Sequence, residues 1–203
     1  MAETKEKILD MAERLFAERG YGATSLRSII GAAEVNLAAV HYHFRSKEAL
    51  LDAVLKRRIE PLTRERMALL DECERAAGDA SPSIEAILTA LIDPPIRLSR
   101  DPAFATFVKL MGRIYADGDT VVIRRHFGAT ADRFMGAMHR ALPALPMEEL
   151  RWRGYFAIAV LAHTLLGATE IVGAAGEATT ERLVTFISAG FRAPVTAGAG
   201  SSV

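Results

Sequence analysis

The strongest constraint on the fold is the spacing of apolar residues, which recur every three or four positions along most of the chain. This period places apolar side chains on one face of an α-helix, whereas a half-buried strand requires strict alternation of apolar and polar residues. No alternating run is long enough for a convincing strand. Because 50% of the 203 residues are apolar, a sizeable core can form, and we expect an all-α fold.

Helix start and stop signals divide this pattern into a series of helices. Gly20 is expected to stop the first helix, and Thr24 or Ser25 can cap the second. Pro94 and Pro95 are expected to end the fifth helix, because proline has no backbone N–H to donate. The expected helices cover about residues 3–19, 25–33, 37–43, 47–73, 83–92, 102–115, 120–142, 147–172 and 180–191.

Charge and cysteine content narrow the class of protein. The net charge is zero, yet residues 25–58 hold six basic and three acidic side chains, a local charge of +3 that gives modest support for nucleic-acid binding. Cys73 is the only cysteine, so no intrachain disulfide or thiolate metal cluster can form. The start of the chain lacks an apolar signal core, and His163 and Glu170 interrupt the most apolar stretch. We therefore expect a cytoplasmic protein with no membrane span.

Residues 25–51, SLRSIIGAAEVNLAAVHYHFRSKEALL, carry the most informative motif. A short helix, a three-residue turn at 34–36 and a second short helix have the lengths of a helix-turn-helix. The apolar side chains of this stretch can fix the angle between the two helices. The second helix then has the size to enter the major groove of DNA.

This motif resembles the DNA-binding domain of the tetracycline-repressor (TetR) family over about residues 4–55. The resemblance rests on Gly20-Tyr21, His41-Tyr42-His43-Phe44 and the segment 46–51, SKEALL. It implies a three-helix DNA-binding domain at residues 1–46 and a helical bundle for ligand binding and dimerisation at residues 47–192. Residues 193–203 are small and polar and are expected to form a disordered tail. Glu34 departs from the family, which usually has a turn glycine there; a positive φ would strain it by roughly 1 kcal/mol.

The resemblance implies phosphate contacts for Ser25, Tyr42 and Lys47, and a groove-facing side of the second helix with base contacts from Asn36 and His41. A partly exposed core position for Tyr42 and a solvated one for Lys47 remain alternatives, and Arg27 points either to phosphate or to solvent. His41 and His43 project about 200° apart on a helix and cannot share a metal ion. The expected DNA-binding residues are Ser25, Arg27, Asn36, Leu37, Ala39, His41, Tyr42 and Lys47.

Beyond residue 59 the resemblance thins, and the pattern of apolar residues carries the interpretation. Aromatic and methionine residues share one face of each of two expected helices, 102–115 and 120–142. Such stripes are usually core, but the family implies an adaptable pocket between helices. His163 and Glu170 either satisfy each other in the core, meet across a dimer, or bind the polar head of an effector. The expected pocket residues are Phe104, Phe107, Met111, Tyr115, Phe134, Met138, Trp152, Phe156 and His163.

The expected helix 147–172 is apolar on all sides, so both of its faces must be buried. One face can pack on its own domain, and the other then needs a partner, which suggests a four-helix dimer interface with two helices per subunit. A three-layer monomer core is the alternative. The expected interface residues are Leu161, Leu165, Ala168, Val172, Leu183, Phe186 and Ile187.

These features predict a ligand-responsive transcriptional repressor that binds a pseudo-palindromic operator in double-stranded DNA as a homodimer. A small apolar effector, such as a fatty acid or acyl-CoA, would release it. The alternative is a DNA-binding structural or partner-binding protein without a small-molecule effector. No catalytic motif is present in the sequence, and we expect neither enzymatic activity nor a cofactor or metal.

Overall fold

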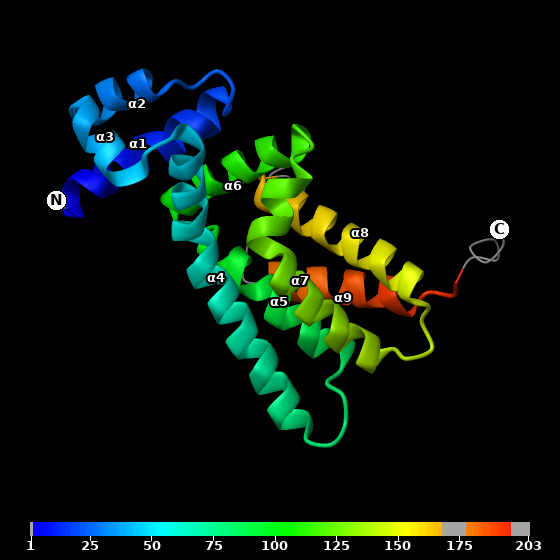
Figure 1. The fold of residues 1–203 in the computed structure, drawn as a ribbon. Helices are drawn as coiled ribbons and strands as arrows, with labels where there is room; N and C mark the ends of the chain where they lie inside the picture. Colours follow the sequence, from blue (N-terminus) through cyan, green and yellow to red (C-terminus); the bar gives the residue numbers. More distant parts are fainter. Residues whose placement is uncertain (1, 168–177, 196–203) are drawn as a thin grey trace. The chain divides into compact units, whose positions relative to one another are not determined.

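The computed structural model describes residues 2–167 and 178–195, without the side chains of residues 2, 37–39 and 41. This part of the chain contains nine α-helices and no strand (Figure 1), which confirms the all-α expectation. None of these helices is long and apolar enough to cross a membrane. The helices are α1 (Ala2–Arg19), α2 (Leu26–Ala33), α3 (Leu37–Phe44), α4 (Lys47–Ala77), α5 (Ile84–Leu98), α6 (Pro102–Ala116), α7 (Thr120–Ala141), α8 (Met147–Leu165) and α9 (Thr179–Arg192).

The chain divides into two compact units. Unit 1 is Met1–Leu62 with Ser99–Gly128, and unit 2 is Thr63–Leu98 with Ala129–Val203. This division differs from the expected boundary at residue 46, because unit 1 also contains the first half of α4, all of α6 and the start of α7.

Unit 1 is organised around α1, whose apolar face is buried. Gly20 ends α1 in a left-handed conformation with φ 85°, and its N–H donates to the Phe16 carbonyl at 3.0 Å. The buried Thr24 hydroxyl then donates to the Gly20 carbonyl at 2.8 Å and the Leu15 carbonyl at 3.1 Å, which holds the loop before α2 against α1. Apolar core side chains of unit 1 that are at most 1% exposed are Ile8, Ala12, Phe16, Ile29, Val40, Leu50, Val54, Leu55 and Leu110.

Helix α6 joins unit 1 because it packs along α1. Asp101 caps its start by accepting the Ala103 N–H at 2.9 Å. Near its other end, the Arg113 guanidinium donates to the carbonyls of Ala17 and Glu18 at 2.6 and 2.7 Å. These carbonyls lie in the last turn of α1, where backbone acceptors lack helical partners. Arg113 therefore caps α1 from a position almost one hundred residues away in sequence, which no local pattern predicts.

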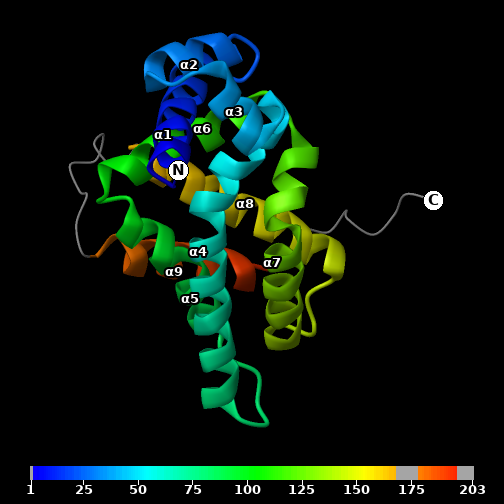
Figure 2. The same ribbon diagram turned by 60° about the vertical axis from the view of Figure 1, so that its left-hand side comes forward.

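Unit 2 is a bundle in which α5 and α9 lie side by side and α8 packs on α9 (Figure 2). Its core is contiguous and includes Leu70, Ile87, Leu88, Ile92, Phe134, Leu150 and Phe191. Gly154 permits a close approach, since a Cβ there would lie 3.0 Å from Met135 Cε of α7.

Helix α5 continues through Pro94 and Pro95 to Leu98, so the expected helix end before the prolines is wrong. The carbonyl of Leu91 faces prolines at both i+3 and i+4 and therefore has neither of its usual backbone donors. The Nε of Arg66, a buried side chain of α4, donates to this carbonyl at 2.8 Å. The side-chain bond replaces the missing backbone bond, and the helix continues.

Candidate functional site

Helix α2 begins at a reciprocal cap of the kind expected for Ser25. The Ser25 hydroxyl accepts the Ser28 backbone N–H at 3.0 Å, and the Ser28 hydroxyl accepts the Ser25 N–H at 3.2 Å. Both hydroxyls thereby satisfy N–H groups that a helix start leaves unpaired. Ser25 stays exposed, so the start of α2 can meet a phosphate group.

The turn between α2 and α3 passes through a left-handed residue. Glu34 has φ 55° and ψ 41°, the positive φ considered from the sequence. Its N–H and that of Val35 donate to the last carbonyls of α2, with Val35 reaching Ile30 at 3.3 Å. The turn has the geometry that favours glycine, and glutamate adopts it at a cost of about 1 kcal/mol.

Helix α3 presents polar and aromatic groups at both ends. Asn36 is exposed just before its start, and the Tyr42 side chain is 71% exposed in its last turn. The Tyr42 ring packs edge-on against His43, with 5.0 Å between centroids, while Phe44 is buried and anchors the helix. The expected base contacts remain predictions, because three of the assigned side chains lie outside the described residues: Leu37, Ala39 and His41.

Lys47 at the start of α4 holds the loop that leads into α2. Its Nζ donates to the carbonyls of Tyr21 and Thr24 at 2.6 and 2.8 Å and lies 4.2 Å from the centre of the Tyr21 ring. Burial, assisted by the Glu48 carboxylate, raises the pKa of Tyr21. An ammonium group has three donors, so only one N–H of Lys47 remains for the expected phosphate contact.

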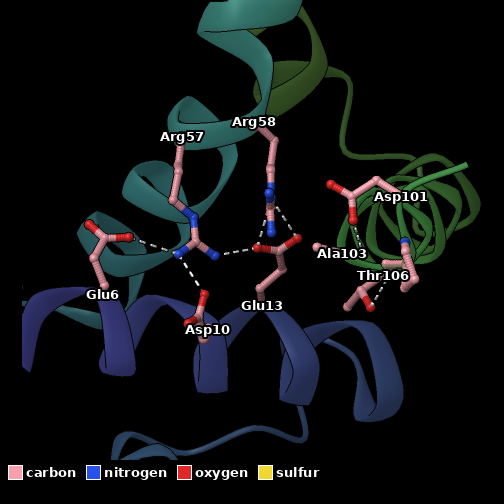
Figure 3. A network of polar contacts seen from close by, with 9 residues as sticks. Glu6, Asp10, Glu13, Arg57, Arg58, Asp101, Ala103 and Thr106 are labelled. Atoms are coloured by element: carbon pink, nitrogen blue, oxygen red, sulfur yellow. Dashed lines mark hydrogen bonds and ion pairs between the residues drawn. The ribbon is translucent and has the colours of Figure 1, made fainter. Parts of the chain in front are cut away.

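A charged network centred on Glu13 joins α1 to α4 (Figure 3). The Glu13 carboxylate, 3% exposed, binds Nη2 of Arg57 and accepts the Nε of Arg58 at 3.1 Å. Arg57 also donates to Glu6 at 3.1 Å and to Asp10 at 2.7 Å. The three acids share one face of α1, because they are spaced four and three residues apart. Two of the six basic side chains in residues 25–58 are therefore neutralised within the unit.

The remaining basic side chains of residues 25–58 include both paired and unpaired ones. Lys56 pairs with Asp52 at 3.0 Å, and Asp52 also lies 3.2 Å from Nε2 of His126. Burial lowers the pKa of His126 despite this carboxylate. Arg27 and Arg45 are both exposed, and neither side chain has a hydrogen bond or ion pair among the described residues. Counting charges along the sequence could not separate these two arginines from the paired ones.

The expected pocket residues do not form a single cluster within either unit. Phe104, Phe107 and Met111 on α6 are buried in unit 1, whereas Phe134 and Met138 on α7 are buried in unit 2. Tyr115, also assigned to the pocket, is 43% exposed.

The two faces of α8 differ in exposure in the opposite sense to that expected from the sequence. Trp152 and Phe156, assigned to the pocket, are 54% and 55% exposed, and His163 is also exposed. Leu161, assigned to a subunit interface, is buried in the core of unit 2. Helical spacing identified both faces, but spacing alone cannot show which face meets the neighbouring helices of the same chain.

The other expected interface residues vary in exposure. Leu183 and Ile187 are buried in the core, Leu165 packs partly against it, and Phe186 is 68% exposed. Helix α8 ends at Leu165 instead of continuing to residue 172. Three residues named in the sequence analysis lie outside the described residues: Ala168, Glu170 and Val172.

The exposed side chains of α8 and α9 include four aromatic residues, which we call the aromatic surface: Trp152, Tyr155, Phe156 and Phe186. Trp152 stacks on Phe156 with 5.8 Å between ring centroids, and Tyr155 packs edge-on against both. A groove of about 250 Å³ between the two helices is lined by Phe156, Val160, Phe186 and Ile187, among others. Large exposed apolar patches of this kind mark interaction sites.

Comparison with known proteins places both parts of the chain in one family. Residues 8–54 match the model of bacterial regulatory proteins of the tetR family, and residues 89–190 match the tetracyclin repressor-like C-terminal domain. The HTH-type transcriptional repressor KstR2 of Rhodococcus jostii is 34% identical over 85 residues, which are 42% of this chain and 40% of the relative. The regulator AcrR of Shigella flexneri is 42% identical over 52 residues, 26% of this chain and 24% of that protein. The chain thus spans less than half the length of these curated relatives.

Solved structures extend the likeness to the whole fold. The fatty acid degradation regulator FadR from Bacillus halodurans matches with a TM-score of 0.69 at 16% identity, over 93% of this chain and 96% of that one. SmeT in complex with triclosan matches with a TM-score of 0.62 at 26% identity, over 92% and 90% of the two chains. On the two family models and this shared fold, the chain belongs to the TetR family of bacterial regulatory proteins.

Proposed function

We propose that the protein is a transcriptional repressor that acts in the cytoplasm and binds a pseudo-palindromic operator as a homodimer. The observation that carries this proposal is the exposed end of α3 in unit 1. Tyr42 projects there with 71% of its side chain exposed, and its hydroxyl is suited to a phosphate oxygen. Relatives such as KstR2 are named transcriptional repressors, which supports the proposal that this protein is also a repressor.

The loop contacts of unit 1 support a helix-turn-helix that is already ordered before it binds DNA. Thr24 and Lys47 fix the segment between α1 and α2, and the Ser25–Ser28 cap fixes the start of α2. A helix-turn-helix positioned in this way presents its second helix to the major groove. Asn36 and His41 are the proposed base readers, Leu37 and Ala39 face the groove, and Ser25, Arg27, Tyr42 and Lys47 meet the backbone.

The aromatic surface supports the dimer. A second copy related by a two-fold axis would cover the same four rings on each subunit, because an isologous interface joins identical patches. The two recognition helices of such a dimer would meet successive major grooves about 34 Å apart.

A small apolar effector completes the proposal, with a fatty acid or acyl-CoA as the leading class. Buried aromatic and methionine side chains on α6, within unit 1, support an apolar ligand. SmeT, a similar structure, is described in complex with triclosan. A ligand can release DNA only if it binds the released state more tightly, and operator DNA must then weaken ligand binding by the same factor.

Selection of duplexes from a random DNA library by the full-length protein tests the proposal. We expect enrichment of a pseudo-palindromic sequence. Asn36→Ala should lose roughly 1–3 kcal/mol on this sequence and little on random DNA, whereas Tyr42→Phe should weaken both alike. Failure to enrich any sequence, with protein that remains folded and dimeric, would contradict the proposed function.

A further inference from the structure

The turn between α3 and α4 contains an unusual backbone conformation at Arg45. This residue has φ 58°, and the Ser46 N–H donates to the Phe44 carbonyl at 2.6 Å across it. A three-residue turn closed by this hydrogen bond is a γ-turn, and a positive φ at its centre is uncommon for a residue with a side chain. Arginine, with a long side chain and a Cβ, is poorly suited to this position, and glycine would occupy it with less strain.

Only Glu34 shares this property with Arg45, since no other non-glycine residue in the described part of the chain has a positive φ. The two residues lie at opposite ends of α3, so the proposed recognition helix is bounded by strained turns on both sides. Strained residues concentrate at functional sites, where the surrounding structure maintains them. The two side chains carry opposite charges, and only the positive one can attract DNA phosphate.

The distribution of charge separates Arg45 from its basic neighbours. Arg57 and Arg58 are bound by Glu13, and Lys56 by Asp52. Arg45 is exposed, and its side chain has no ion pair or hydrogen bond within the described residues. Its charge is therefore available to an external anion.

Arg45 also follows Tyr42 by three residues, at the exposed end of α3. A phenol hydroxyl and a guanidinium group at the same end of a helix can each engage an oxygen of one nucleic-acid backbone, and arginine can bind phosphate through two parallel N–H donors.

We propose that Arg45 is a DNA-phosphate ligand and that the strained turn serves to present its side chain beside Tyr42. This inference rests on the proposed function, and it adds a contact that neither the sequence pattern nor the family resemblance assigned.

Arg45→Gly and Glu34→Gly form a matched pair, because each replaces one strained charged residue by glycine at one end of α3. We expect both variants to keep a melting temperature equal to or above that of the parent protein, since the relief of strain offsets the added chain entropy of glycine. Arg45→Gly should bind the selected duplex and a random duplex about tenfold more weakly at moderate salt. The slope of log affinity against log salt should fall by about 0.9 per protomer contact. Glu34→Gly should keep the parental slope and bind at least as tightly.

Arg45→Lys should keep the salt slope, because the charge remains. Helical circular dichroism and sedimentation confirm that each variant is folded and has the parental oligomeric state. Parental affinity and salt slope in Arg45→Gly would overturn the inference while leaving the proposed function intact. A parent protein that binds no duplex would overturn both.

Discussion

The buried guanidinium of Arg66 contributes to the stability of unit 2 by donating to the Leu91 carbonyl. In Arg66→Met, the Leu91 carbonyl would lose its donor and stay buried, which should cost about 1–3 kcal/mol of unfolding free energy. Urea unfolding followed by circular dichroism measures this loss. Arg64→Met is the matched control, because Arg64 is exposed on the same helix and should change stability by no more than about 0.5 kcal/mol. Equal stability of the two variants would contradict the proposed role of Arg66.

Glu13 should contribute to stability more than the other acids of α1. Glu13→Gln keeps the shape of the side chain but removes the charge that faces Arg57 and Arg58, and it should cost about 1–3 kcal/mol. Glu18→Gln is a suitable control on the same helix, because the Glu18 side chain is exposed. Chemical denaturation at low and high salt measures the loss of unfolding free energy in each variant. A loss in Glu13→Gln as small as in the control would show that the Glu13 charge contributes little to stability.

At single positions, sequence reasoning succeeded where the cause was local. The cap at Ser25 depends on neighbouring residues and is present in the structure. The turn glycine that the family usually has at position 34 indicated where a positive φ could occur, and Glu34 adopts one. The partners of Arg113 and Lys47 could not be predicted, because each reaches carbonyls on a helix end or loop that is distant in sequence. In the sequence, Arg45 was only one of the six basic residues in residues 25–58, because the spacing of residue types does not predict its positive φ.

Among the helices, the contact between α5 and α9 predicts a defined response to acid. Arg192 hydrogen-bonds Glu85 and lowers the pKa of that carboxyl from 4.5 to about 2. A lowered native pKa adds stability above the unfolded value and loses it as the pH falls through the native value. The contribution of this pair should therefore be complete above pH 4.5 and disappear towards pH 2. Because both side chains are partly exposed, solvent screening keeps the effect modest.

Glu85→Gln tests this response. The variant should melt below the parent protein at pH 7, and the difference should shrink steadily between pH 4.5 and pH 2. Glu181→Gln on α9, an exposed position, should melt in parallel with the parent at every pH. A constant gap between Glu85→Gln and the parent across this range would show that the ion pair does not set the acid response.

Helix positions followed from periodicity, but helix ends and the roles of helix faces did not always follow. The expected stop at Pro94 was wrong because Arg66 compensates from another helix. The apolar pattern identified two faces of α8 but did not show which one is buried in its own unit, because a helix that is apolar on all sides gives no signal for its internal face. Tertiary packing supplies that information.

For the whole molecule, the aromatic surface predicts the oligomeric state. Phe186→Glu should convert a dimer into a monomer in sedimentation experiments, because the charge would be buried without a partner at the interface. Val121→Glu is the control, since Val121 is 66% exposed on α7 and lies outside the aromatic surface. The monomer should also lose most of its affinity for a two-half-site operator. A dimeric Phe186→Glu protein would place the interface elsewhere.

The hydrogen bond between Arg66 and the Leu91 carbonyl also couples the residue types at two positions on different helices, 66 on α4 and 95 on α5. Proline at position 95 removes the N–H that would donate to the Leu91 carbonyl, and Arg66 replaces that donor, so the helix can continue. Arg66 in turn has a buried acceptor only because Pro95 leaves this carbonyl without its backbone donor. Replacing Pro95 by alanine would restore an N–H that competes with the guanidinium for one oxygen. The two positions are therefore expected to covary among close relatives, and an alignment in which they change independently would contradict this coupling.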